Sequence, residues 1–111
     1  MLANAKWLVS PILPIFGLRT THYIMPEISR FFGIIIRMFF DDHNPPHFHA
    51  EFQEYRAIID IRSAKLLDGN FPPKQLKQVQ AWTLLHQQEL MENFINLGKE
   101  LKSYSKIDPL Q

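Results

Sequence analysis

The first clear apolar pattern in the chain runs from Ile28 to Phe40. This stretch is rich in β-branched and aromatic residues and contains no helix stop signal, so it predicts a β-strand. Both faces of that strand are largely apolar, which is typical of a central strand covered on more than one side. We expect Gly33 to mark a bulge or a bend within it.

A polar break and two further strands follow. Residues 41–46 interrupt the first strand, because Asp and Asn favour turns and proline cannot donate a hydrogen bond to a neighbouring strand. Residues 47–53 alternate between apolar and polar side chains, which predicts a second strand. Residues 56–61 predict a third, and Leu-Asp-Gly-Asn at 67–70 predicts a tight turn after it. A three-stranded antiparallel meander is the simplest arrangement.

From Lys74 to about Lys102 the apolar spacing changes to that of a helix. Pro72-Pro73 opens this element, since proline is tolerated in the first turn. At about 100° per residue, one stripe collects eight side chains: Leu76, Val79, Trp82, His86, Leu90, Phe94, Leu97 and Leu101. A bare three-stranded sheet is not stable alone, so the stripe must cover its apolar face. We therefore predict an α+β fold, with a three-stranded antiparallel meander packed against a long C-terminal helix.

Residues 1–24 are expected to stand apart from this domain. The apolar run from Trp7 to Phe16 follows Lys6, is interrupted by two prolines and is too short to span a bilayer as a helix. A secretion signal is the weaker alternative, because no A-x-A-like cleavage site follows. We expect residues 1–24 to be a poorly ordered extension or a misassigned start, and residues 25–111 to form a single domain. We expect no membrane partner.

Composition narrows the range of partners and cofactors. The 111 residues suffice for one domain, and 12 basic against 11 acidic side chains leave a net charge of +1. The whole-chain charge therefore does not favour a polyanion, although a local patch that binds RNA stays open. Without cysteine, any metal must be held by histidine, carboxylate or carbonyl ligands.

The candidate chemistry lies in the segment Asp-Asp-His-Asn-Pro-Pro-His-Phe-His at residues 41–49. Strand alternation places His47, His49 and Glu51 on one face, with neighbouring positions roughly 7 Å apart. Imidazole and carboxylate groups at this spacing can share one divalent ion, such as zinc, nickel or manganese. The alternatives are metal-free acid–base chemistry and a purely structural role, so no cofactor is certain.

Further polar residues extend this candidate site. Asp42 and His43 precede the double proline, which limits where they can point. His86 lies within the apolar stripe, where a ring facing the sheet needs a hydrogen-bond partner. Imidazoles titrate near neutrality and can divide acid and base roles. The candidate catalytic residues are thus His43, His47, His49, His86 and Asp42, and Arg37 is a candidate anion contact.

Leu84, Met91 and Ile95 form a second, narrower apolar patch on the predicted helix. It predicts either ordinary core contact or a surface for a homodimer or another partner, and the sequence leaves both open.

Several of these segments resemble a bacterial family catalogued as domain of unknown function 4160. The resemblance rests on residues 25–33 and 40–51, with the specific core Asp-His-Asn-Pro-Pro-His-Phe-His at 42–49. Asp68-Gly69, Pro72 and the spaced residues Trp82, His86, Glu89-Leu90 and Asn93 resemble its C-terminal helix. Family chains usually begin at the residue matching Met25, and they usually have Trp where this chain has Phe94.

The resemblance implies a small prokaryotic cytoplasmic protein, without assigned catalytic residues. It also implies a genetic setting shared with a small protein of unknown-function family 2442, a pairing similar to toxin–antitoxin modules. We therefore predict the toxin-like member of such a pair, with a His-rich site acting on RNA or a phosphorylated substrate and Glu51 as ligand or base. The alternatives are a non-catalytic binding or regulatory module with structural histidines, and a metal-binding domain without catalysis. Whether the protein is an enzyme stays open.

Overall fold

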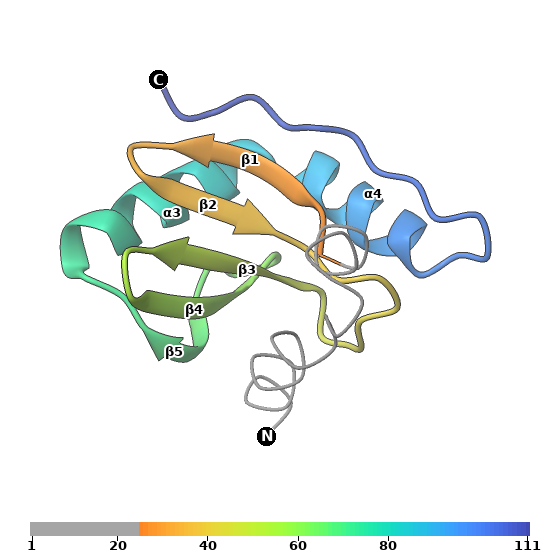
Figure 1. Cartoon of the computed structure of the whole chain (residues 1–111), viewed down its shortest axis with the longest axis horizontal. Helices are drawn as coiled ribbons and strands as arrows, with labels where there is room; N and C mark the ends of the chain where they lie inside the picture. Colours follow the sequence, from red (N-terminus) through yellow and green to blue (C-terminus); the bar gives the residue numbers. More distant parts are fainter. Residues whose placement is uncertain (1–24) are drawn as a thin grey trace, which may run out of the picture.

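Residues 25–111 are described by a computed structural model, in which a five-stranded antiparallel sheet is covered on one face by two helices (Figure 1). Each strand pairs with the next one in the chain. The strands are β1 (Glu27–Phe31), β2 (Ile34–Arg37), β3 (His47–Phe52), β4 (Tyr55–Asp60) and β5 (Leu66–Asn70). The predicted α+β class is confirmed, whereas the count of three strands is wrong. The prediction for residues 1–24 lies outside the described residues.

The single strand predicted over residues 28–40 is a hairpin. Phe32 and Gly33 form its two-residue turn, with φ angles of 51° and 79°, and Phe31 pairs with Ile34 across it. Two-residue hairpin turns favour positive φ because this backbone twist matches that of the flanking strands. Apolar residues stand on both sides of the turn, so no polar break in the sequence marks it.

Residues 67–70, predicted as a tight turn, belong to β5. Gly69 pairs with Ala57 of β4 and has a φ angle of 93°. A Cβ atom added at Gly69 would lie 2.3 Å from the backbone oxygen of Arg56. Glycine is needed here because two strands approach closely, not because the chain reverses. The turn prediction is therefore wrong.

Two helices, α3 (Pro73–Leu85) and α4 (Gln87–Leu97), take the place of the predicted long helix. His86 separates them, with a φ of −127° and a ψ of 27° that lie outside the helical region. Because only this residue interrupts the helices, the apolar spacing continues across the break and conceals it. Among residues 25–111, no helix has the length and apolar character that crossing a bilayer requires.

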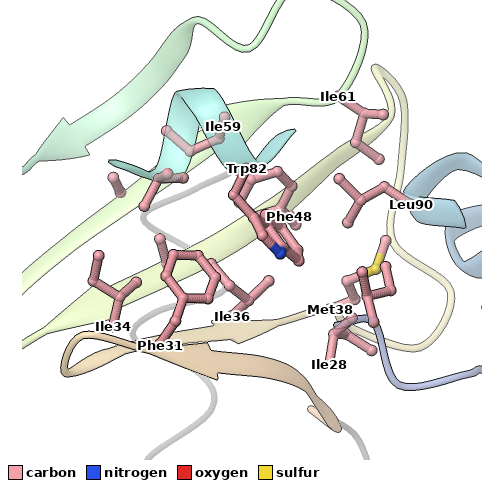
Figure 2. Packing of buried hydrophobic residues seen from close by; sticks show 14 of the residues in the cluster. Ile28, Phe31, Ile34, Ile36, Met38, Phe48, Ile59, Ile61, Trp82 and Leu90 are labelled. Carbon is pink, nitrogen blue, oxygen red and sulfur yellow. The ribbon is translucent and has the colours of Figure 1, made fainter. Parts of the chain in front are cut away.

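The helical stripe packs on the sheet up to Leu97. The ring of Trp82 lies 5.7 Å from that of Phe48 on β3 and 5.3 Å from that of Phe31 on β1, measured between centroids (Figure 2). Aromatic rings of this size bury the largest apolar areas in a core. Leu101, also assigned to the stripe, is 88% exposed because α4 ends before it.

Residues 98–111 form a segment that we call the C-terminal strap, which runs past α4 and alongside β1 (Figure 1). The backbone nitrogen of Ile107 donates a hydrogen bond to the carbonyl oxygen of Ile28, at 3.0 Å. The indole nitrogen of Trp82 donates to the carbonyl oxygen of Asp108, at 2.8 Å. The strap thus occupies the outer edge of β1 and satisfies a buried donor.

Candidate metal site

The segment between β2 and β3 is held by the C-terminal part of the chain. The backbone nitrogen of Asp41 donates to the carbonyl oxygen of Leu97 at 3.2 Å, and the Lys102 ammonium donates to the Asp41 carboxylate at 2.8 Å. Asp41 has a φ of 54°, a left-handed conformation that Asp adopts more readily than most residues. These contacts fix the backbone immediately before Asp42.

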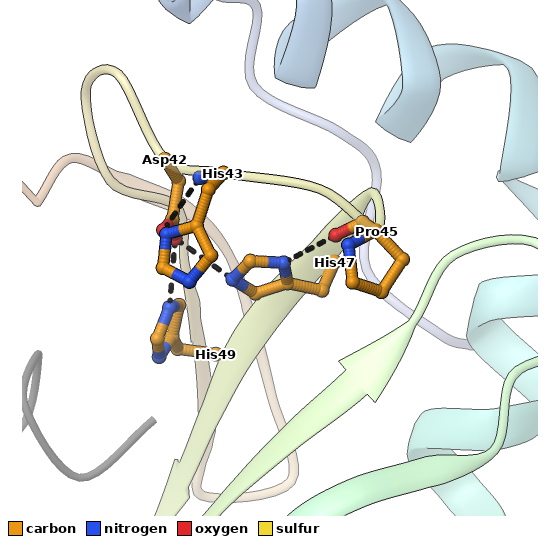
Figure 3. Close-up of polar contacts among 5 residues, drawn as sticks. All are labelled: Asp42, His43, Pro45, His47 and His49. Atoms are coloured by element: carbon orange, nitrogen blue, oxygen red, sulfur yellow. Dashed lines mark hydrogen bonds and ion pairs between the residues drawn. The ribbon is translucent and has the colours of Figure 1, made fainter. Parts of the chain in front are cut away.

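Asp42 and two histidines meet in the interior. The side chain of Asp42 is 2% exposed, and those of His47 and His49 are fully buried. Asp42 Oδ2 lies 2.8 Å from His47 Nε2 and 3.2 Å from His49 Nε2 (Figure 3). One carboxylate oxygen therefore faces a ring nitrogen of each histidine, and we call these three residues the Asp42 cluster.

The other oxygen of Asp42 faces His43. It accepts a hydrogen bond from the backbone nitrogen of His43 at 3.0 Å and lies 3.3 Å from the Nδ1 atom of that ring. The side chain of His43 is 48% exposed, in contrast to those of the cluster. Oδ2 of Asp42 thus faces the two buried histidines, whereas Oδ1 faces the exposed ring of His43.

The ring of His47 has a defined hydrogen-bonding state. Its Nδ1 atom lies 2.6 Å from the backbone oxygen of Pro45 (Figure 3). A carbonyl oxygen can only accept, so Nδ1 must carry the hydrogen. In the neutral ring, Nε2 is then an acceptor with its lone pair, and it is this atom that approaches Asp42.

Aromatic rings surround the two buried histidines. The ring of His49 lies 4.3 Å from that of Phe39, and the ring of His47 lies 5.8 Å from that of Phe94, measured between centroids. The two imidazoles themselves are 5.3 Å apart. An apolar shell of this kind excludes water and strengthens electrostatic interactions inside it.

The structure brings Asp42, rather than Glu51, to the two histidines. In the part of the chain that is described, the group able to hold a metal ion is Asp42, His47 and His49, with ligand atoms within 4.8 Å of one another. Glu51 instead lies beside Arg37, with 3.4 Å between Oε2 and Nε. Arg37 also donates to the backbone oxygen of Met25 at 3.2 Å, so an anion would have to compete with both partners.

His86 lies at the junction of α3 and α4. Its Nδ1 atom contacts the carboxylate of Glu89, and its ring centroid lies 5.4 Å from that of Trp82. The predicted need for a hydrogen-bond partner is met by Glu89, in the first turn of α4. His86 is not among the residues of the Asp42 cluster.

The predicted patch of Leu84, Met91 and Ile95 divides between core and surface. Met91 packs against the core, whereas Leu84 is 60% and Ile95 is 53% exposed. The two exposed side chains are therefore the part of the predicted patch that a partner could contact.

Asp42 was predicted as a candidate catalytic residue, and its place beside His47 and His49 in the group able to hold a metal ion was missed. Alternation within β3 correctly places His47 and His49 on one face, because it depends only on strand geometry. Asp42 lies in a loop, and its position depends on contacts with distant residues such as Leu97 and Lys102. The signal that pointed to it was the double proline, which restricts the loop between Asp42 and His47.

Comparison with known proteins adds a family but no activity. The family model described as "Domain of unknown function (DUF4160)" matches residues 33–94. This range contains the Asp42 cluster, His43, His86 and most of both helices. No curated protein and no solved structure matches the chain.

Proposed function

The chain belongs to the family of domain of unknown function 4160, and from the Asp42 cluster we propose that this domain binds a divalent transition metal. Asp42, His47 and His49 would be the ligands. The observation that carries the proposal is the 2.8 Å approach of His47 Nε2 to Asp42 Oδ2 when the Nδ1 atom of the same ring already donates to Pro45.

This approach needs a proton or a metal ion between the two atoms. A neutral His47 ring would direct the lone pair of Nε2 at a carboxylate oxygen, and two acceptors at this distance repel each other. Burial deepens the cost, because a buried carboxylate without compensation is strongly destabilising. A metal ion bound by both atoms removes the repulsion, and so does a proton on Nε2.

The surroundings favour the metal over the proton. Metal-bound histidines usually donate their second ring nitrogen to a carbonyl or carboxylate oxygen, as His47 does to Pro45. With metal–ligand bonds of about 2 Å, two ligand atoms on a tetrahedral ion are about 3.3 Å apart and two imidazole centroids about 5 Å apart. The spacing of 3.2 Å between His49 Nε2 and Asp42 Oδ2 and the ring separation of 5.3 Å are close to these values. The 2.8 Å between His47 Nε2 and Asp42 Oδ2 is shorter by about 0.5 Å, so these two atoms would move apart when the ion binds.

The donor set limits the metal and its role. Imidazole nitrogens suit zinc or nickel better than manganese, and affinity for manganese is the lowest of the three. Because the three ligands are buried, a small ion fits the site better than an RNA chain does. Membership of a toxin–antitoxin-type pair, an antitoxin-like partner and action on RNA remain predictions from the resemblance alone.

A second candidate, a protein-binding module, is favoured by the exposed side chains of Leu84 and Ile95. Exposed apolar residues on neighbouring helices provide a contact surface for a second copy or for a small partner protein. Sedimentation of the wild-type chain and of Leu84→Lys tests the homodimer. A dimer that the substitution dissociates would support this candidate, and a monomer in both would remove the homodimer.

The metal proposal is tested by elemental analysis of protein purified without a His tag, equilibrated with zinc and then desalted. We expect near one equivalent of zinc in the wild type and in the matched control His86→Ala. Asp42→Asn and the double variant His47→Ala/His49→Ala should retain little. If the wild type binds no zinc or nickel and His47→Ala only lowers the unfolding midpoint, the cluster holds a proton instead of a metal ion, and its role is to stabilise the fold.

A further inference from the structure

We infer that His43 is the fourth ligand of this ion and the residue through which the ion enters and leaves. The inference rests on the proposed metal site and deepens it, because it decides whether the site is open to substrate or closed. The observation behind it is the contrast between His43, which is 48% exposed, and the three buried ligands beside it.

His43 lies within reach of the ion. Its Nδ1 atom is 3.3 Å from Asp42 Oδ1, and its ring centroid is 6.1 Å from that of His47. Two imidazoles on one tetrahedral ion have centroids about 5 Å apart. His43 is outside the group of ligand atoms that lie within 4.8 Å of one another, so its ring must turn toward Asp42 Oδ2 to bind the ion. A side-chain rotation provides this movement at an exposed position without disturbing the core.

Whether His43 binds the ion decides what kind of metal site this is. Structural zinc sites have four protein ligands, whereas catalytic sites keep one position for water or substrate. With Asp42, His47 and His49 alone, the site would keep such a position. With His43 added, the site is closed, and its role is to hold the loop over residues 41–46 against β3 rather than to activate water.

The same arrangement gives the ion a route to solvent. The three buried ligands leave no exposed side chain among them, so the ion must pass a group that can move aside. His43 follows Asp42 directly in the chain and is exposed enough to do so. Loading and release of the metal would then fasten and free the loop, which makes the site responsive to metal concentration.

The test uses cobalt as the probe, since four-coordinate cobalt absorbs visible light much more strongly than six-coordinate cobalt. Tag-free wild-type protein should bind cobalt with strong visible bands. In His43→Ala, water molecules enter the open position and raise the coordination number of cobalt to five or six, so we expect weaker bands and a Kd raised roughly tenfold or more. The control His86→Ala should match the wild type in both respects.

A second variant tests proximity directly. The chain contains no cysteine, so in His43→Cys any sulfur-to-cobalt charge-transfer band in the near ultraviolet must come from residue 43. That band supports the inference. Its absence, or an unchanged Kd and spectrum in His43→Ala, would overturn it while leaving the three-ligand site intact. A wild-type chain that binds neither cobalt nor zinc would instead remove the proposed function itself.

Discussion

Residues on both faces of β3 are buried, but burial has opposite effects on the stability of the fold for the two faces. Phe48 points to the helices and packs against Trp82, so its burial removes apolar surface from water and stabilises the fold. His47 and His49, its neighbours on either side, point to Asp42, and burial of these polar groups costs free energy that their contacts must offset. The apolar face is therefore stabilised by burial itself, whereas the polar face depends on the partners of its polar atoms, which in the proposed function include a metal ion.

The largest expected effect comes from breaking the apolar face. Trp82→Ala removes the central ring of the core and leaves the carbonyl of Asp108 without its indole donor. Truncations of this kind cost about 3–5 kcal/mol in free energy of unfolding. Chemical denaturation measures the loss. The control Leu85→Ala, at a side chain 69% exposed, should change stability by less than about 0.5 kcal/mol.

If both variants lost the same stability, the core would not be centred on Trp82. A fully unfolded Trp82→Ala chain would agree with the prediction in direction, and Trp82→Phe would then give a measurable intermediate value.

The next effect comes from the polar face and depends on metal. An ion that binds only the folded state stabilises it by about 2.7 kcal/mol when its free concentration is 100 times Kd. Zinc should therefore raise the free energy of unfolding of the wild type, and a chelator should reverse the gain. Asp42→Asn should show no zinc-dependent gain, whatever its own stability. A gain of equal size in both would place the metal outside the Asp42 cluster.

The same contrast explains how far the sequence could predict the fold. Packing on the apolar face follows local periodicity, so the alternation of β3 and the helical stripe through Trp82 and Leu90 were predicted. The turn at Phe32-Gly33 was predicted only as a bulge or a bend, and the break at His86 was not predicted, because the apolar pattern continues on both sides of each.

The polar face depends on contacts between residues far apart in the chain, which no local pattern reports. His47 and His49 were placed together by strand alternation, but the approach of Asp42 follows from the loop that Leu97 and Lys102 hold. The C-terminal strap was missed for a related reason. It is fastened by the buried side chain of Ile107 and by hydrogen bonds at scattered positions, without a periodic pattern of its own.

A smaller effect separates the strap from the metal site. The side chain of Asn93 on α4 is buried and makes two hydrogen bonds with the backbone of Ser105, both 2.8 Å long. Asn93→Ala should lower the free energy of unfolding by about 1–3 kcal/mol, because both groups of Ser105 lose their partner. Zinc content should stay at the wild-type value. Loss of zinc together with stability would mean that the strap is needed to form the site.

The smallest effect concerns an ion pair in which both charges are accessible to solvent, unlike those of the Asp42 cluster. The Arg30 guanidinium hydrogen-bonds the Glu27 carboxylate at 2.8 Å and lowers the pKa of that carboxyl below its ordinary value of 4.5. The unfolded chain therefore takes up a proton first as the pH falls. The contribution of the pair is fully present above the ordinary carboxyl pKa and is lost as the pH drops through the lower, folded value. Because Arg30 is 58% exposed, solvent screens the pair, and exposed pairs of this kind are worth about 0.2–1 kcal/mol.

Denaturation of wild type and Glu27→Gln at neutral pH should thus differ by no more than this amount, with Gln the less stable. The difference should shrink in high salt and vanish at a pH below the lowered pKa of the folded state, where the carboxyl is protonated in both states. A difference that persisted there would show that Glu27 acts through packing rather than charge. The zinc-dependent gain should be the same in both chains at neutral pH, because this pair lies on β1 and the Asp42 cluster lies on β3 and the loop before it. The stability contributed by the exposed pair would then depend on salt concentration, and that contributed by the buried cluster would depend on metal concentration. This distinction is expected if burial decides whether a charge needs an ion to compensate it.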